Sequence, residues 1–136
     1  MIIMAIDIGA ARTGLAVSDK GEKFAFPRGV IHEKNTEKLV EKIAAALSEN
    51  NAELIVAGLP KNMDGSEGFK AAECREIAEK VAKISGLPLE FQDERLTTAS
   101  AHIALENNQI SGKKRKNVVD TVAATIILEA FLARRK

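Results

Sequence analysis

The chain has 136 residues, 46% of them hydrophobic and 29% charged, which suits one globular domain and leaves no room for a second. A formal net charge of +1 excludes a nucleic-acid binder that relies on bulk positive charge. Cys74 is the one cysteine, so an internal disulfide is excluded and we expect a reducing compartment, the cytoplasm. The apolar N-terminus has no basic start, and we expect neither a signal peptide nor a membrane span there.

Three strands are predicted in the first 31 residues. Residues 2–6 form an unbroken apolar run, which is typical of a central strand covered on both faces. A second strand carries Leu15 and Val17 in alternation with smaller residues. The third, at residues 24–31, contains Pro27, which cannot donate to a neighbouring strand and therefore favours an edge position. The short turns between these strands favour an antiparallel meander.

Helices and strands alternate in the rest of the chain. Asn35 or Thr36 can cap a helix over residues 36–49, and a buried strand follows at 54–57. A loop at 58–68 then leads to a helix. The apolar face predicted for this helix carries Cys74, Ile77, Val81 and Ile84. Cys74 is therefore interpreted as a small core residue.

The last quarter of the chain is predicted to hold one strand and two helices. The strand carries Leu89 and Phe91 and ends at Gln92. Thr97 or Thr98 can cap a helix that ends near residue 106, and a long helix follows over about residues 117–133. This order of elements indicates an α/β fold, a mixed sheet with right-handed crossovers and helices on its faces.

Three acids stand out against this architecture. Asp7 closes the first strand, and Glu94 comes two residues after the end of the fifth, so both lie at carboxyl ends of strands, where α/β sheets place their ligands. Asp120 falls on the same face of the last helix as its apolar residues. A carboxylate on that face needs a base, a hydrogen-bond network or a metal ion.

Convergence of Asp7, Glu94 and Asp120 predicts a catalytic metal site. Hard divalent cations prefer oxygen ligands, so Mg²⁺ is the expected ion and Mn²⁺ its substitute. Two such ions about 3.5 to 4 Å apart activate water and stabilise the leaving oxygen in phosphodiester cleavage. The alternative is that each acid pairs with a neighbouring arginine or caps a turn.

Positive charge is concentrated late in the chain. Lys113, Lys114, Arg115 and Lys116 precede the last helix, and Arg134, Arg135 and Lys136 end the sequence. Contact with a phosphate backbone would release counterions and so favour binding. A solvated loop and a frayed tail are the alternative interpretation.

Four segments of the chain resemble the YqgF family. They are Asp7-Ile8-Gly9 with residues 12–19, residues 58–68, Asp93 to Thr98, and the basic run at 113–116 with Val119 to Ala124. The resemblance covers essentially the whole chain, in order. It implies one ribonuclease H-like domain over residues 1–136, with a five-stranded sheet of order 3-2-1-4-5. Members are described as pre-16S rRNA nucleases, and earlier as Holliday junction resolvases by their likeness to RuvC.

The sequence departs from the resolvase branch of that superfamily at two places. Resolvases take their second acid from the fourth strand, whereas Glu94 follows the fifth predicted strand. They also carry two acids one turn apart on the last helix, whereas this chain has Asn117 three residues before Asp120. The amide oxygen of Asn117 could serve as a ligand, but the missing charge weakens the case for a second metal ion.

Other residues of the matching segments have weaker expected roles. Arg12 and Arg95 flank the acids, where a guanidinium group either holds a phosphate or pairs with the carboxylates. The polar loop at 61–68 suits substrate contact or a simple turn. His32 and His102 have no companion at ligand spacing and are interpreted as structural.

Two rival functions remain open from sequence. Asp7-Ile8-Gly9 with residues 12–14 also resembles the phosphate loop of actin-like ATPases, although those enzymes bind nucleotide between two domains. A catalytically silent nucleic-acid-binding module is the other. RNA and branched DNA are not distinguished, because the 2′-hydroxyl readout has no linear signature. A resolvase would favour a homodimer, whereas an RNA-trimming enzyme can act as a monomer.

Overall fold

A five-stranded mixed sheet organises the molecule. The computed structural model describes residues 1–62, 64–94 and 112–135, and of residues 112–121 it describes the backbone only. The strands are β1 (Ile3–Ile8), β2 (Arg12–Ser18), β3 (Ala25–His32), β4 (Leu54–Leu59) and β5 (Leu89–Asp93). Their order across the sheet is β3-β2-β1-β4-β5, with β1–β2 and β2–β3 antiparallel and β1–β4 and β4–β5 parallel. The predicted meander, edge strand and sheet order are confirmed.

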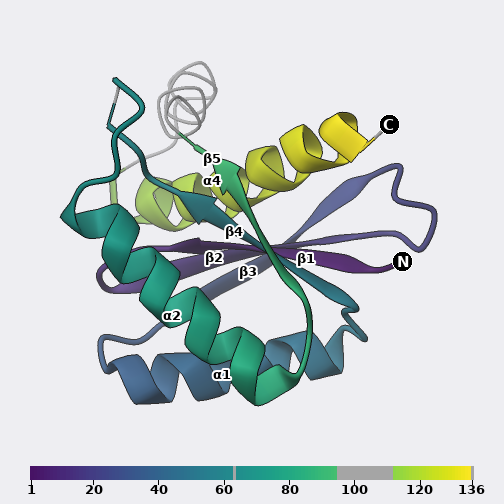
Figure 1. The fold of residues 1–136 in the computed structure, drawn as a ribbon, viewed down its shortest axis with the longest axis horizontal. Helices are drawn as coiled ribbons and strands as arrows, with labels where there is room; N and C mark the ends of the chain where they lie inside the picture. The colour runs from purple at the N-terminus through teal and green to yellow at the C-terminus, as the bar shows by residue number, and fades with distance from the viewer. Residues whose placement is uncertain (63, 95–111, 136) are drawn as a thin grey trace.

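Helices cover both faces of the sheet (Figure 1). The helices α1 (Thr36–Glu49) and α2 (Phe69–Ser85) lie on one face, and α4 (Gly112–Arg135) lies on the other. Alternate residues of β1 divide between the two layers, since Met4 and Ile6 pack with α1 and α2 while Ile3 and Ala5 pack with α4. This two-sided burial is why residues 2–6 are continuously apolar.

The predicted helix at residues 36–49 is confirmed at both ends. Asn35 is the N-cap of α1, and its side-chain oxygen accepts a 3.0 Å hydrogen bond from the Lys38 N–H. This bond satisfies one of the backbone donors that the first helical turn leaves without a partner. No helix within the described ranges is both long and apolar enough to cross a membrane.

Several predicted boundaries were wrong. β4 continues through Gly58 and Leu59, the first two residues of the predicted loop, because both pair with β5. β5 likewise runs one residue past Gln92, to Asp93. Ile84 is 62% exposed instead of buried, since it lies in the last turn of α2, where the helix leaves the core. The helix predicted at residues 97–106 lies outside the described residues.

The last helix begins five residues earlier than predicted. α4 starts at Gly112, so the backbone of Lys113 to Lys116 is helical and does not form the expected loop. Lysine and arginine are good helix formers, and no breaker stands between Gly112 and the apolar part of the helix. The basic run therefore belongs to the first turns of the helix that carries Asp120.

Candidate active site

The carboxyl ends of the strands bring Asp7 and Glu94 together. Asp7 is the next-to-last residue of β1, and Glu94 directly follows β5. β4 lies between those two strands, and the Glu94 N–H donates a 3.2 Å hydrogen bond to the carbonyl oxygen of Leu59 at its end. The carboxyl groups of Asp7 and Glu94 share a hydrogen bond. Glu94 therefore reaches across β4 to meet Asp7.

Gly58 of β4 provides the space for this reach. Leu54 and Val56 face α4, and strand alternation places Gly58 on the same side. A Cβ atom at Gly58 would lie 2.5 Å from Oε2 of Glu94 and 2.5 Å from Cδ1 of Ile127 in α4. A side chain at this position would thus displace the carboxyl group of Glu94 and the end of the Ile127 side chain. The carboxyl group of Glu94 therefore lies over β4, although the residue itself follows β5.

Burial and mutual repulsion perturb the ionisation of Glu94. The residue is 8% exposed, and its Oε2 is buried without a hydrogen-bond partner among the described residues. Burial raises the pKa of Glu94 to about 9, helped by the negative charge of Asp7, the hydrogen bond with Asp7 and the charge of Asp93. Two carboxyl groups in contact cannot both ionise cheaply without a cation.

The raised pKa predicts a pH-dependent stability for the metal-free protein. A carboxyl group whose pKa is higher in the folded state stabilises that state below the unfolded value, near 4.5, and this contribution is lost as the pH rises towards about 9. In chelator, wild type should therefore lose stability relative to Glu94→Gln over that range. Denaturant midpoints measured for both proteins at a series of pH values check this, and a difference that does not change with pH would contradict it.

The backbone of α4 places Asp120 close to this end of the sheet. Figure 1 shows α4 beginning near the carboxyl ends of β1 and β4. Asp120 stands one helical turn before Ala124 and two turns before Ile127, both fully buried against the sheet. The structure describes only the backbone of Asp120, so the convergence of its side chain with Asp7 and Glu94 stays a prediction.

The predicted phosphate-binding residues are only partly described. Arg12 is the first residue of β2, and its carbonyl oxygen accepts a 2.9 Å hydrogen bond from the Gly9 N–H in the turn after β1. Register pairing of Ile8 with Thr13 puts Arg12 at the same edge of the sheet as Asp7. Arg95 lies outside the described residues, and the basic run is described by its backbone alone. His32 ends β3 opposite Arg12, and His102 is not described.

The donor set fits a hard divalent cation. Asp7 and Glu94 present carboxylate oxygens, which such ions prefer, and the buried Oε2 of Glu94 has no partner within the described part of the chain. A cation would offset both the burial and the repulsion by Asp7, which together raise the Glu94 pKa. Among the described side chains, no three His, Cys, Asp or Glu come together as a complete metal cluster. The predicted third ligand, Asp120, is not among those side chains.

Cys74 is a core residue, as predicted. It is 5% exposed, and its thiol donates a 3.6 Å hydrogen bond to the carbonyl oxygen of Ile8. Burial, followed by the negative charges of Glu94 and Asp7, raises the pKa of the Cys74 thiol to about 12. The thiol is therefore protonated at neutral pH and is not a nucleophile for this site.

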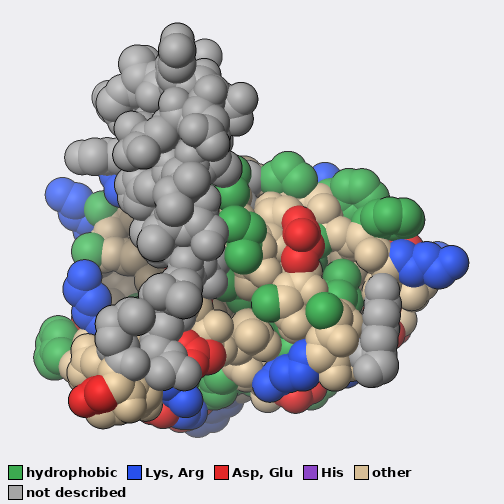
Figure 2. All heavy atoms as spheres, turned by 90° about the horizontal axis from the view of Figure 1, so that it is seen from above, with side chains coloured by type: hydrophobic (Ala, Val, Ile, Leu, Met, Phe, Trp, Pro, Cys, Tyr) green, Lys and Arg blue, Asp and Glu red, His purple; other side chains and the backbone are tan. Residues whose placement is uncertain are grey.

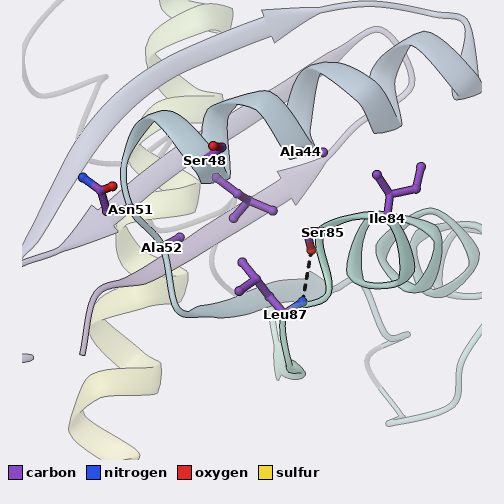
Figure 3. A pocket seen from close by; sticks show the side chains of 8 residues that line it. Ala44, Ser48, Asn51, Ala52, Ile84, Ser85 and Leu87 are labelled. Carbon is purple, nitrogen blue, oxygen red and sulfur yellow. Dashed lines mark hydrogen bonds between the residues drawn. The ribbon is translucent and has the colours of Figure 1, made fainter.

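Two cavities differ in their chemistry. One of about 530 Å³ lies between the C-terminal ends of α1 and α2, and its lining, from Ala44 to Leu87, contains no charged side chain (Figure 3). The other, of about 300 Å³, lies at the carboxyl ends of the strands and is lined in part by Asp7 and Glu94. Only the second has groups that can do acid–base or metal chemistry, so it belongs to the candidate site.

Sequence reasoning missed two contributors to the site. Gly58 was placed in a loop, although the apolar residues on either side of it indicate that the strand continues to Leu59. Lys70, in the first turn of α2, lines the smaller cavity and had no motif to mark it. Its role depends on the packing of α2 against the sheet, which has no local signature.

The fold defines the class of protein. The sheet order and the helix layers are those of a ribonuclease H-like fold, which the chain shares with T. thermophilus RuvC in complex with a Holliday junction substrate. That comparison has a TM-score of 0.62 and covers 99% of this chain and 96% of RuvC. The sequence identity is 16%, so the likeness establishes the fold alone.

Sequence comparison identifies the family. A profile of the RuvX family, described as Holliday junction resolvase, matches residues 1–134. A protein of Leuconostoc mesenteroides named "Putative pre-16S rRNA nuclease" is 42% identical over 137 residues, covering 97% of this chain and 94% of that protein. A protein of the same name from Halothermothrix orenii is 41% identical over 132 residues, with 97% and 94% covered. The chain belongs to the RuvX (YqgF) family and is a nuclease, a hydrolase of phosphodiester bonds.

Proposed function

We propose that this chain is a divalent-cation-dependent endonuclease that processes the 5′ end of pre-16S rRNA in ribosome biogenesis. The name shared by the relatives from Leuconostoc mesenteroides and Halothermothrix orenii supports the substrate. The observation that carries the chemistry is the contact between Asp7 and Glu94, with a buried carboxylate oxygen that lacks a partner within the described ranges. The lone, buried Cys74 supports a cytoplasmic location.

In this proposal Asp7, Glu94 and Asp120 hold Mg²⁺, for which Mn²⁺ can substitute. The bound cation supplies an activated water and stabilises charge on the leaving oxygen. Gly58 leaves room for Glu94, and β1 and α4 supply the other two acids. Arg12 and Arg95 orient the phosphate that is cleaved. The buried position of Glu94 limits competition from bulk water for the cation.

Holliday junction resolution is the second candidate function. The description of the RuvX family names this activity, and the structural likeness to RuvC extends over nearly the whole chain. A resolvase makes two symmetric cuts, which favours a homodimer, whereas the rRNA proposal is compatible with a monomer. The metal site and phosphate contacts are common to both, so substrate preference has to distinguish them.

A parallel cleavage assay tests the proposed function. Purified protein is given a pre-16S rRNA precursor and a four-way DNA junction, each with Mg²⁺, with Mn²⁺ and with chelator. The proposal predicts cation-dependent cutting of the precursor near the mature 5′ end and weaker cutting of the junction. Preferential symmetric cutting of the junction would favour resolution. No cutting of either substrate would leave the silent nucleic-acid-binding module as the better account.

The basic run at the start of α4 is predicted to contact the phosphate backbone of the nucleic acid. The described Lys and Arg side chains are scattered over the face seen in Figure 2 and form no basic patch there. Replacing Lys113, Lys114, Arg115 and Lys116 with glutamine should weaken binding of different sequences about equally. The slope of log affinity against log salt should fall by nearly one unit per lost contact. Catalysis at saturating substrate should survive.

Dissociation constants measured across a salt series for wild type and this quadruple variant decide the point. Equal slopes of log affinity against log salt for the two proteins would show that the run does not contact phosphates. A loss of thermal stability without a change in affinity would show that the run instead neutralises nearby acids. Replacement of Lys80 and Lys83, which lie in the second half of α2 and outside the lining of the cavity, provides a control for lost positive charge.

A further inference from the structure

The smaller cavity extends beyond the two acids. It has a volume of about 300 Å³ and lies between the start of α1, the first half of α2 and the carboxyl end of β1. Ile8, Leu39 and Ile77 give it apolar walls from these three elements. Leu39 and Ile77 are 3% and 7% exposed, so these walls are set in the core. The volume is at the lower end of the range for small-molecule pockets, about 300–1,000 Å³.

Two lysines and several acidic residues line this cavity. Lys34, just before α1, and Lys70, in the first turn of α2, both line it and are exposed. The N-cap of α2 is Gly68, which offers no side-chain hydrogen bond to the helix, and the first turn contains no acidic residue. Glu33 and Glu73 also line the cavity, and Glu33 is engaged by Lys42 at 2.8 Å. The lining thus places the ammonium groups of Lys34 and Lys70 beside the carboxyl groups of Glu33, which Lys42 pairs, and Glu73, around an apolar interior.

Asp7 and Glu94 form part of the same lining, so whatever fills the cavity lies beside the catalytic carboxylates. A ligand suited to it has a flat apolar body, hydrogen-bonding edges and a phosphate. A nucleotide whose base is unpaired has all three features, whereas a base inside a duplex is stacked and cannot enter a pocket.

We propose that this cavity binds one unpaired nucleotide adjacent to the phosphate that is cleaved. Its base lies among Ile8, Leu39 and Ile77, and Lys34 and Lys70 contact its phosphate. The inference rests on the proposed nuclease function and narrows its substrate class. The enzyme cuts next to an unpaired or extruded base and not within an uninterrupted duplex.

Binding of free nucleotides tests the cavity without any cleavage. Adenosine and deoxyadenosine 5′-monophosphate are titrated into the full chain in chelator, followed by amide chemical shifts. The proposal predicts saturable shifts at Lys34, Lys70 and their neighbours at millimolar nucleotide, and a tighter ribonucleotide would indicate contact with the 2′-hydroxyl. Shifts confined to other surfaces, or none, would overturn it. Equal shifts with inorganic phosphate alone would also overturn it, because the base would then contribute nothing.

A cleavage experiment tests the same cavity during turnover. Ala10 is an exposed alanine that lines the cavity, and Ile77 lies in α2, a different element of the lining. Ala10→Leu and Ile77→Phe each narrow the cavity from a different side. If one variant folds poorly, the other still provides the test. Ala72→Leu, an exposed alanine of α2 outside the lining, is the matched control.

Each protein is assayed on a substrate with an unpaired base next to the cut and on the same substrate with that base removed. Ala10→Leu and Ile77→Phe should each raise KM at least about tenfold for the substrate with the unpaired base, and much less for the substrate without it. Wild type should prefer the intact substrate. Equal rates of wild type on both substrates would overturn the inference while leaving the nuclease function standing. Absence of any cleavage would refute the nuclease function. The nucleotide titration would then still test whether the cavity binds a nucleotide.

Discussion

Replacing Glu94 by glutamine is expected to lower cation-dependent cleavage by roughly 10²- to 10³-fold, the loss typical of removing one group that stabilises a transition state. The same change should raise the melting temperature of the protein in chelator. Glutamine keeps the size of the side chain but cannot ionise, so the repulsion between positions 94 and 7 disappears. Asp7→Asn and Asp120→Asn should lower cleavage to a similar extent while leaving the fold intact.

The pairing of lost activity with gained stability is the diagnostic result. A residue needed only for folding would lose both together, whereas strain at a functional site is relieved by removing the functional group. Glu41→Gln, an exposed glutamate of α1, is the control for loss of one negative charge. Cleavage at the wild-type rate in any one of the three acid variants would remove that residue from the catalytic set.

Gly58→Ala is expected to damage both stability and cleavage. The new Cβ atom would lie 2.5 Å from Oε2 of Glu94 and from Cδ1 of Ile127, so both of these buried side chains would have to shift away from it. Overpacking of this kind costs about 1–3 kcal/mol. Because the new Cβ atom displaces the carboxyl group of Glu94 from its position over β4, cleavage should fall about as far as in Glu94→Gln.

Denaturant unfolding and cleavage rates of Gly58→Ala check this prediction. Gly68→Ala is the comparison for a glycine replaced without overlap, since a Cβ atom there would have its nearest neighbour at 3.4 Å, in Asn62, and any stability it loses comes from the N-cap of α2. The double variant Gly58→Ala with Ile127→Val, which has a shorter side chain, should recover part of the stability. Wild-type stability and activity in Gly58→Ala would show that Glu94 does not need the space above β4.

Much of the fold could be predicted from local pattern. The unbroken apolar run at residues 2–6 predicted a central strand, and Pro27 predicted an edge. The Asn35 cap and the apolar spacing after it gave α1 both of its ends. These signals are local, because each depends on burial or on backbone donors within a few residues.

The parts that could not be predicted depend on pairing between distant segments. Gly58 and Leu59 belong to β4 because β5 is hydrogen-bonded beside them, and the apolar residues around Gly58 do not identify that partner. Ile84 fits the apolar face of α2, yet the helix passes beyond the core at that point and leaves the side chain exposed. Helical spacing identifies the apolar face of a helix, but not the residue at which the rest of the protein stops covering that face.

The site was predicted in part and for a general reason. Asp7 and Glu94 follow apolar strands, and the topology places the ends of parallel strands together, so their proximity was predictable. How the two side chains meet could not be predicted, because it depends on Gly58, a residue without a side chain, in the strand between them. Asp120 and the basic run remain predictions for their side chains.

The binding of a divalent cation by the folded protein tests the central claim most directly. Melting temperatures of wild type, Glu94→Gln and Glu41→Gln are measured over a range of Mg²⁺ and of Mn²⁺ concentrations. A ligand that binds only the folded state adds about 2.7 kcal/mol at 100 times its dissociation constant. We expect wild type and Glu41→Gln to be stabilised with increasing cation, Glu94→Gln to be unaffected, and zinc not to be required. Equal stabilisation of all three proteins, or none up to millimolar cation, would contradict a metal site at Asp7 and Glu94.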